Sequence, residues 1–172
     1  SVTCTDGSTY TIQRGGSMPN VVIIGGKLYI IFSTMVNNTF CNMRCIYNPA
    51  TDAVESYSLC KLADAPLTLE GLKSKGYNLE HYSDDYVNKT LNLNAWCGNA
   101  KASDGSYYIG MCLCGSYKYP FVLKTTDFET FEVFKQIEQP QSLAMFEMST
   151  CLSADGKTLY TASRNSLLRY SI

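Results

Sequence analysis

A short unit recurs along the chain: a tight turn built on Asp-Gly or Gly-Gly, followed by a β-prone segment that carries a tyrosine. Its four copies cover residues 6–12, 25–31, 104–110 and 155–161. Asp-Gly and Gly-Gly supply the positive φ angles that two-residue hairpin loops need. The β-branched and aromatic residues that follow suit a pleated strand. The repeated unit therefore predicts an all-β, largely antiparallel fold.

Two longer segments extend this pattern to four strands each. In residues 20–60 and 100–136, β-prone stretches alternate with turn residues such as Asn48-Pro49 and Thr126-Asp127. Each segment predicts four strands joined by hairpins. About 40 residues for four strands is the length of one propeller blade.

The stretch 61–99 interrupts the rhythm of strands and is predicted to be an inserted, irregular loop. A short helix is expected near 66–76, with Thr68 as its N-cap, Lys73 in its last turn and Gly76 at its C-terminal cap. We therefore expect residues 1–172 to form a single β domain with one insertion. Long insertions in regular β folds are often functional.

Residues 152–160 resemble the strand–turn–strand signature of β-propeller repeats, and residues 123–131 look like the turn of sialidase-type Asp-box repeats and five-bladed glycosidase propellers. Glu129 stands where an Asp box has glycine. In such a turn the Asp carboxylate bonds backbone N–H groups and an aromatic residue anchors the next strand. The residues expected to have such structural roles in turns are Asp6, Gly26, Asp104, Asp127 and Asp155.

The resemblance implies antiparallel, β-propeller-like repeats, and a β-sandwich built from the same hairpins is the alternative. Two full units and two partial ones do not readily close a ring of four or more blades. The chain is then either part of a longer propeller or assembles with other subunits.

The composition is poor in charge and rich in tyrosine. Charged residues make up 17% of the chain, the formal net charge is −1, and there are 13 tyrosines. Such a surface is typical of extracellular modules, sugar binders and virion proteins. No basic stripe is present to neutralise phosphates, which argues against nucleic acid as a partner. No apolar run reaches the length of a transmembrane helix, so membrane insertion is not expected.

Residue patterns for catalysis and metal binding are weak. His81 is the single histidine, so a nucleophile would have little choice of base. Nothing in the spacing of the carboxylates selects the facing pair that a glycosidase needs; the candidates are Glu80, Asp84, Asp85, Glu129 and Glu147. The spacing of the eight cysteines is poor for zinc. We predict one or two disulfides at most, and no catalytic residue, metal or cofactor.

Binding requires only exposed aromatic platforms with polar partners, and the inserted loop supplies both. The predicted ligand-binding residues are Tyr77, Tyr82, Asp84, Asp85, Tyr86 and Trp96. The sequence therefore favours a non-catalytic recognition or structural module of a virion or cell surface that binds a glycan or protein receptor. A homo-oligomer or larger assembly is expected. The alternative is a carbohydrate-active enzyme, or a fragment of one.

Overall fold

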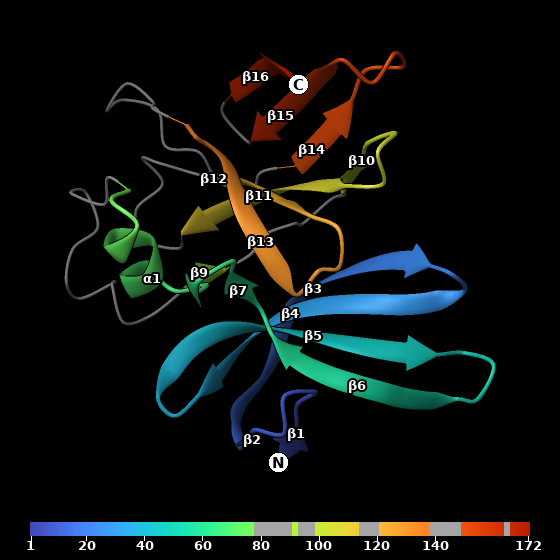
Figure 1. Cartoon of the computed structure of the whole chain (residues 1–172), viewed down its shortest axis with the longest axis vertical. Helices are drawn as coiled ribbons and strands as arrows, with labels where there is room; N and C mark the ends of the chain where they lie inside the picture. Colours follow the sequence, from blue (N-terminus) through green and yellow to red (C-terminus); the bar gives the residue numbers. More distant parts are fainter. Residues whose placement is uncertain (78–90, 93–98, 114–120, 138–148, 164–165) are drawn as a thin grey trace.

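The computed structural model describes residues 1–77, 91–92, 99–113, 121–137, 149–163 and 166–172. Within them the chain is built from largely antiparallel β-sheets and a single short helix, which confirms the predicted all-β class. Figure 1 shows the sheets stacked from the N-terminus to the C-terminus.

The first large sheet contains four strands in chain order, β3 (Ile12–Ile24), β4 (Lys27–Val36), β5 (Thr39–Asn48) and β6 (Ala53–Leu59). All neighbours pair antiparallel, so the four-stranded prediction for 20–60 is confirmed. Strand β3 begins earlier than predicted, and its register with β4 shifts three times between Ile12 and Asn20. It is regular only from Asn20 to Ile24.

The second large sheet has the order β10 (Ala100–Lys101), β11 (Tyr107–Leu113), β12 (Phe121–Thr125), β13 (Thr130–Gln136), β7 (Lys61–Leu62) and β8 (Ala65–Pro66), and β9 (Leu91–Asn92) pairs with β11. Its first four strands confirm the prediction for 100–136. The β7–β8 hairpin lies at the start of the stretch that was predicted to be irregular. It joins the sheet because β7 pairs with β13 in parallel.

Two smaller sheets lie toward the two ends of the chain. Strands β1 (Val2–Thr3) and β2 (Thr9–Tyr10) form a hairpin near the N-terminus. Strands β14 (Ser149–Leu152), β15 (Thr158–Ser163) and β16 (Ser166–Ser171) form a three-stranded sheet near the C-terminus, with β14 beside β10 and β11.

The predicted two-residue loop occurs at Gly25-Gly26 but not at the Asp-Gly turns. Gly25 and Gly26 have φ angles of 57° and 78°, and the flanking Ile24 and Lys27 pair directly. This loop requires positive φ at both central residues, which two glycines meet without strain.

The Asp-Gly turns are longer loops, which corrects the prediction. At Asp6-Gly7 the Cys4 N–H donates to the Ser8 carbonyl at 2.8 Å, so three residues separate the closing pair. Only Gly7 has a positive φ, 84°. The Asp6 carboxylate accepts from the Ser8 N–H at 2.9 Å, a local bond that holds the aspartate in the right-handed region and favours a type I turn followed by a glycine bulge.

The other two Asp-Gly loops use the same chemistry. Asp104 accepts from the Ser106 N–H at 2.9 Å, and Asp155 accepts from the Lys157 N–H at 3.1 Å. The last loop has one more residue, since the Ser153 N–H donates to the Thr158 carbonyl at 2.8 Å. The sequence shows this extra residue, because the unit 155–161 has one more residue before its tyrosine, Tyr160, than the other units have.

The predicted helix is present as α1 (Leu69–Ser74). The Thr68 hydroxyl accepts from the Gly71 N–H at 3.0 Å, so Thr68 is the N-cap. At the other end, the N–H groups of Gly76 and Tyr77 donate to the carbonyls of Lys73 and Leu72. With φ of 81° at Gly76, this is a Schellman motif.

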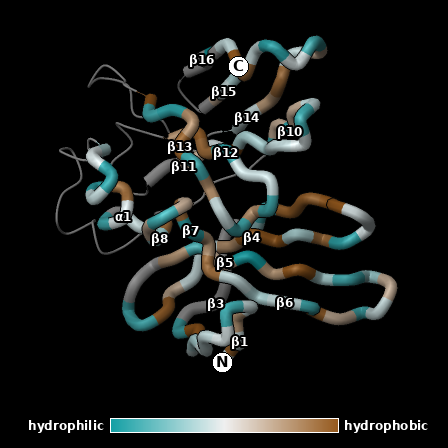
Figure 2. The backbone as a smooth tube through the Cα atoms, in the orientation of Figure 1, coloured by the Kyte–Doolittle hydropathy of each residue, from teal (hydrophilic) through white to brown (hydrophobic). Residues whose placement is uncertain are grey.

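The main core lies between the two large sheets. It contains buried aromatic and aliphatic side chains of the second sheet, with Ile31 and Tyr29 packed against them from the first. The aromatic members of this core are Tyr107, Phe121, Phe128 and Phe131. Figure 2 shows the hydrophobic stretches of β3 and β4 that belong to the first sheet. A second cluster, with Tyr108, Val122 and Leu159, joins the second sheet to the three-stranded one.

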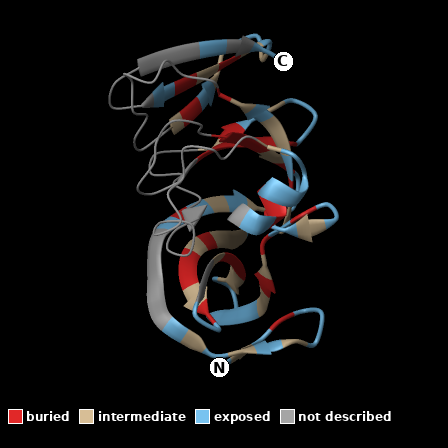
Figure 3. Ribbon diagram, turned by 90° about the vertical axis from the view of Figure 1, so that its left-hand side faces the viewer, coloured by how far each residue is buried: buried red, intermediate tan, exposed pale blue. Residues whose placement is uncertain are grey.

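A third cluster lies inside the first sheet, which curls into a half-barrel. Met43 and Val36 form its floor, and Cys4 and Tyr10 of the N-terminal region cover it. Figure 3 shows the curled sheet, with the N-terminus at its lower edge. The first sheet thus has packed apolar side chains on both of its faces.

Candidate functional site

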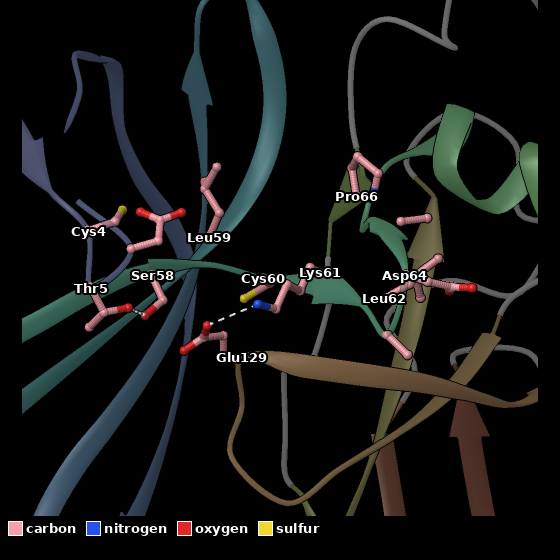
Figure 4. A pocket seen from close by; sticks show the side chains of 13 residues that line it. Cys4, Thr5, Ser58, Leu59, Cys60, Lys61, Leu62, Asp64, Pro66 and Glu129 are labelled. Atoms are coloured by element: carbon pink, nitrogen blue, oxygen red, sulfur yellow. Dashed lines mark hydrogen bonds and ion pairs between the residues drawn. The ribbon is translucent and has the colours of Figure 1, made fainter. Parts of the chain in front are cut away.

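A groove opens where the N-terminal turn, the end of β6 and the β7–β8 hairpin meet. Its volume is about 400 Å³, which falls in the range of small-molecule sites. We call it the junction groove. It is lined by Cys4, Thr5, Asp6, Ser58, Leu59, Cys60, Lys61, Leu62, Ala63, Asp64, Ala65, Pro66 and Glu129. Figure 4 shows these residues.

Backbone hydrogen bonds hold the walls of the junction groove in place. The Thr5 N–H donates to the Tyr57 carbonyl at 2.9 Å, which ties the N-terminal turn to β6. The Lys61 N–H donates to the Glu129 carbonyl at 2.8 Å, which ties the start of β7 to the turn before β13. Three segments distant in sequence are therefore joined in one rim.

Arg44, buried beneath the groove, connects the two large sheets. From β5 its guanidinium donates to the Asp127 carbonyl at 2.8 Å and to the Ser58 hydroxyl at 2.8 Å. It also donates to the Glu129 carboxylate at 2.7 Å. The guanidinium carbon lies 5.9 Å from the centre of the Tyr29 ring. A buried arginine requires this degree of pairing, since an uncompensated buried charge is costly.

Lys61 and Glu129 place opposite charges at the groove surface. The Lys61 ammonium lies 3.5 Å from Oε1 of Glu129, while Oε2 of Glu129 faces Arg44. The two side chains point toward each other in Figure 4. The Lys61 side chain is 53% exposed, so it retains capacity for further hydrogen bonds.

Other polar groups complete the rim. The Thr5 and Ser58 hydroxyls lie 3.1 Å apart and are hydrogen bonded. The Asp64 carboxylate is paired with Lys75. The pKa of Asp6 is below its usual value, chiefly because the Ser8 hydroxyl and N–H donate to it. Asp6 is therefore a carboxylate at neutral pH.

The two thiols in the groove wall are unreactive groups. Burial raises the pKa of Cys4 and, more strongly, that of Cys60. The Cys60 thiol donates to the Phe128 carbonyl at 3.6 Å. Both are protonated at neutral pH, and a protonated thiol is a poor nucleophile.

The cysteines that the structure describes with their side chains are free. They are Cys4, Cys41, Cys45, Cys60 and Cys151, and only Cys151 is exposed. The predicted disulfides therefore do not involve these residues. Where they are buried, the thiols act as small apolar side chains.

Of the predicted ligand-binding residues, the structure describes Tyr77. Its ring is half-buried and packs edge-on against Phe121, with ring centres 5.6 Å apart. It lies outside the junction groove. Tyr82, Asp84, Asp85, Tyr86 and Trp96 lie outside the described residues, as do His81, Glu80 and Glu147. The binding role of these six residues therefore stays a prediction.

The residues that do form the site include several that the sequence did not single out for binding: Thr5, Ser58 and Lys61. Arg44 was not singled out from the sequence, and Glu129 was noted as a departure from the Asp-box pattern and as one of five candidate carboxylates for a glycosidase.

Within the described ranges, no three side chains of histidine, cysteine, aspartate or glutamate gather as metal ligands. No described helix has the length and apolarity to cross a membrane. No protein-family model matches the chain, and no curated protein matches it.

Proposed function

We propose that this chain is a non-catalytic recognition module that binds a glycan in the junction groove. The observation that carries the proposal is a groove of about 400 Å³ with an exposed lysine and carboxylates on its rim and no activated nucleophile among its described residues. The charge-poor, tyrosine-rich composition supports a place on a virion or cell surface.

Binding is favoured over catalysis because the reactive groups of the groove are already engaged. Both oxygens of the Glu129 carboxylate face cations, and both groove thiols have raised pKa values. A glycosidase needs one carboxyl group held protonated opposite a second one. Glu129 is instead paired with Arg44 and Lys61, and no second carboxyl group among the described residues that line the groove contacts it.

A glycan suits the groove better than an apolar ligand. Lys61 donates hydrogen bonds, Asp6 accepts them, and the Thr5 hydroxyl does both, which is the mixture that neighbouring sugar hydroxyls require. Leu62 and Pro66 offer apolar surface for the C–H face of a sugar ring. The opposite charges of Lys61 and Glu129 favour a neutral ligand.

We further propose that sheets β3–β6 and β10–β13 are successive blades of a β-propeller-like assembly. Three features support this. The first sheet is a four-stranded meander, and β10–β13 form a four-stranded meander within the seven-stranded second sheet. The Asn99 amide, next to the first strand of one, donates to Asn20 in the first strand of the other at 2.6 Å. The turn at Asp127 also has Asp-box chemistry, because its carboxylate accepts from the N–H groups of Glu129 and Thr130 at 2.8 Å.

The test is a glycan array followed by calorimetric titration of the best ligand. We expect Lys61→Ala to weaken binding about tenfold or more, because one charge-assisted hydrogen bond is worth roughly 1.5–3 kcal/mol. Lys73→Ala is the matched control, since Lys73 is an exposed lysine on α1. It should bind as the wild type does.

Two outcomes would contradict the proposal. One is equal affinity of Lys61→Ala and Lys73→Ala for every glycan that binds. The other is hydrolysis of a glycoside that Glu129→Gln abolishes. That result would assign the chain to the carbohydrate-active enzymes.

A further inference from the structure

A second, smaller cavity adjoins the junction groove at the turn of the β7–β8 hairpin. Its volume is about 210 Å³, and its lining includes Leu62, Ala63, Lys75, Tyr77, Phe131 and Glu132. We call it the hairpin pocket. Since a cavity of roughly 150 Å³ can hold a benzene ring, the hairpin pocket has room for one six-membered ring with its substituents.

Two features place the hairpin pocket directly beside the junction groove. Leu62 and Ala63 line both cavities. Asp64, which lines the groove, is paired with Lys75, which lines the hairpin pocket. Ala63 is exposed and carries only a methyl group, so its side chain is a small obstacle between the two cavities.

The junction groove is elongated toward the hairpin pocket. In Figure 4 its labelled residues run from Thr5, past Lys61, to Asp64 at the other end. The Asp64 side chain is 70% exposed, so this end of the groove is open to solvent. A ligand bound beside Lys61 can therefore continue along the groove and past Ala63 into the hairpin pocket.

The hairpin pocket repeats the chemical character of the groove. Leu62 and Phe131 are buried and give it an apolar floor. One basic side chain, Lys75, and one acidic side chain, Glu132, supply hydrogen-bonding groups. This combination of apolar surface with one lysine and one acidic residue suits the same class of ligand in both cavities.

Tyr77 adds an aromatic wall that the junction groove lacks. Its ring is half-buried and meets the Phe121 ring at an interplanar angle of 89°. A perpendicular contact of this kind covers at most one face of the Tyr77 ring. An aromatic face beside hydrogen-bonding groups fits a sugar ring, which is apolar on its C–H face and polar at its edge.

We propose that the hairpin pocket is a second sugar subsite, and that the ligand of this chain is an oligosaccharide that occupies both cavities at once. The inference rests on the proposed binding of a glycan in the junction groove. It adds that Tyr77 and Lys61 contact different sugars of one chain. Because both subsites hold the same molecule, affinity should increase with oligosaccharide length until both are filled.

Calorimetric titration with oligosaccharides of increasing length tests the proposal. The probes are the best-binding glycan of the array, its forms shortened one sugar at a time, and cellulose, chitin and amylose oligosaccharides from the monosaccharide to the hexasaccharide. For the wild type, affinity should rise with length and then level off. Tyr77→Ala should remove this rise: the longest probe should bind about tenfold more weakly, and the shortest probe that the wild type binds should be unaffected.

Tyr77→Phe is the matched control, since it keeps the ring and should keep the rise in affinity. Retained binding of the shortest probe shows that Tyr77→Ala is folded. Glu132→Ala is a second variant, at an exposed position of the pocket, and should weaken only the longer probes, several-fold. If Tyr77→Ala loses the shortest probe as well, Glu132→Ala decides alone.

Two results would overturn the second subsite while leaving the proposed function intact. One is a wild-type affinity that does not change with oligosaccharide length. The other is unchanged affinity of both Tyr77→Ala and Glu132→Ala for the longest probe. Failure of the proposed function has a different signature: Lys61→Ala should weaken probes of every length, and if it weakens none, glycan binding in the groove is wrong and the second subsite with it.

Discussion

At the scale of single residues, the Asp-Gly turns show how a side chain selects a loop. Asp104 accepts from both the N–H and the hydroxyl of Ser106. This bond keeps the aspartate in the right-handed region and leaves only Gly105, with φ of 85°, to take a positive angle. The sequence Asp-Gly was therefore sufficient to place the turn, but its length depended on a side-chain bond.

The same bonds make the folded state sensitive to acid. Donors from Ser106, together with the Lys124 ammonium, lower the pKa of Asp104 from 3.8 to about 2. A carboxyl group whose pKa is lower in the folded state stabilises that state above its ordinary pKa. The contribution is lost as the pH falls from about 4 through about 2.

We therefore expect Asp104→Asn to flatten the pH dependence of the free energy of unfolding between about pH 4 and about pH 2. Part of the dependence should remain, since the pKa values of Asp6 and Asp155 are lowered too. Urea unfolding at a series of pH values measures this pH dependence of the free energy of unfolding. Ser103→Ala in the same loop is the non-titrating control. An unchanged pH profile in Asp104→Asn would show that this carboxylate does not couple to folding.

At the scale of elements, helix α1 depends on one close backbone approach. A Cβ built on Gly71 would lie 1.9 Å from the Pro66 carbonyl oxygen. The segment that enters the helix therefore runs directly over the first turn. Thr68 lies between Pro66 and the first residue of the helix, and it caps the helix. The glycine was not recognised from the sequence as a packing residue, because within a short helical pattern it is also consistent with weak helix propensity.

Gly71→Ala should destabilise the protein by roughly 1–3 kcal/mol, because the added methyl group collides with backbone that cannot move independently. Propensity alone predicts the opposite, since alanine is better than glycine in a helix interior by about 1 kcal/mol. Lys73→Ala, at an exposed position of the same helix, is the control. The shift in the urea midpoint of Gly71→Ala decides between destabilisation by the collision and stabilisation by helix propensity. A gain in stability would contradict the steric explanation.

The hairpins and the helix could be predicted because their determinants are local. Gly25-Gly26 and the Thr68–Gly76 capping pattern specify their geometry within a few residues. The parallel pairing of β7 with β13 could not be predicted in this way. It pairs Lys61 with Thr130, which are far apart in the sequence, so no local pattern specifies it. The junction groove was missed for the same reason: its rim comes from three separate segments, and the short patterns at 6–12 and 123–131 predict turns without showing that these turns meet.

At the scale of the whole molecule, the two large sheets are held by a polar contact as well as by the main core. Arg44 and Glu129 are separated by 85 residues in the sequence and meet at 2.7 Å. Glu129 departs from the Asp-box pattern, and this contact gives the departure a physical reason: the residue after the turn reaches back to the preceding sheet. In a propeller-like assembly, such a contact would join one blade to the next.

Arg44→Met should therefore cost more than the loss of a surface ion pair, which is worth at most about 1 kcal/mol. It leaves the Ser58 hydroxyl, the Asp127 carbonyl and one oxygen of Glu129 without their donor, and removing one partner of a buried pair costs roughly 3–5 kcal/mol. Because Glu129 is 23% exposed and keeps Lys61, we expect a value near the lower end, about 3 kcal/mol. Glu129→Leu alone should also destabilise the fold, since it leaves Arg44 underpaired.

The double variant decides whether the two residues act as one contact. If they do, Arg44→Met combined with Glu129→Leu should cost less than the sum of the two single changes, by about 1 kcal/mol or more. Urea unfolding of the four proteins gives this coupling energy, and Lys27 with Glu55, an exposed ion pair at 2.6 Å within the first sheet, is the matched control pair. Equal coupling in the two cycles would mean that the second sheet docks through its apolar core alone. A larger coupling for Arg44 and Glu129 would mean that the polar contact helps fix how successive sheets are placed.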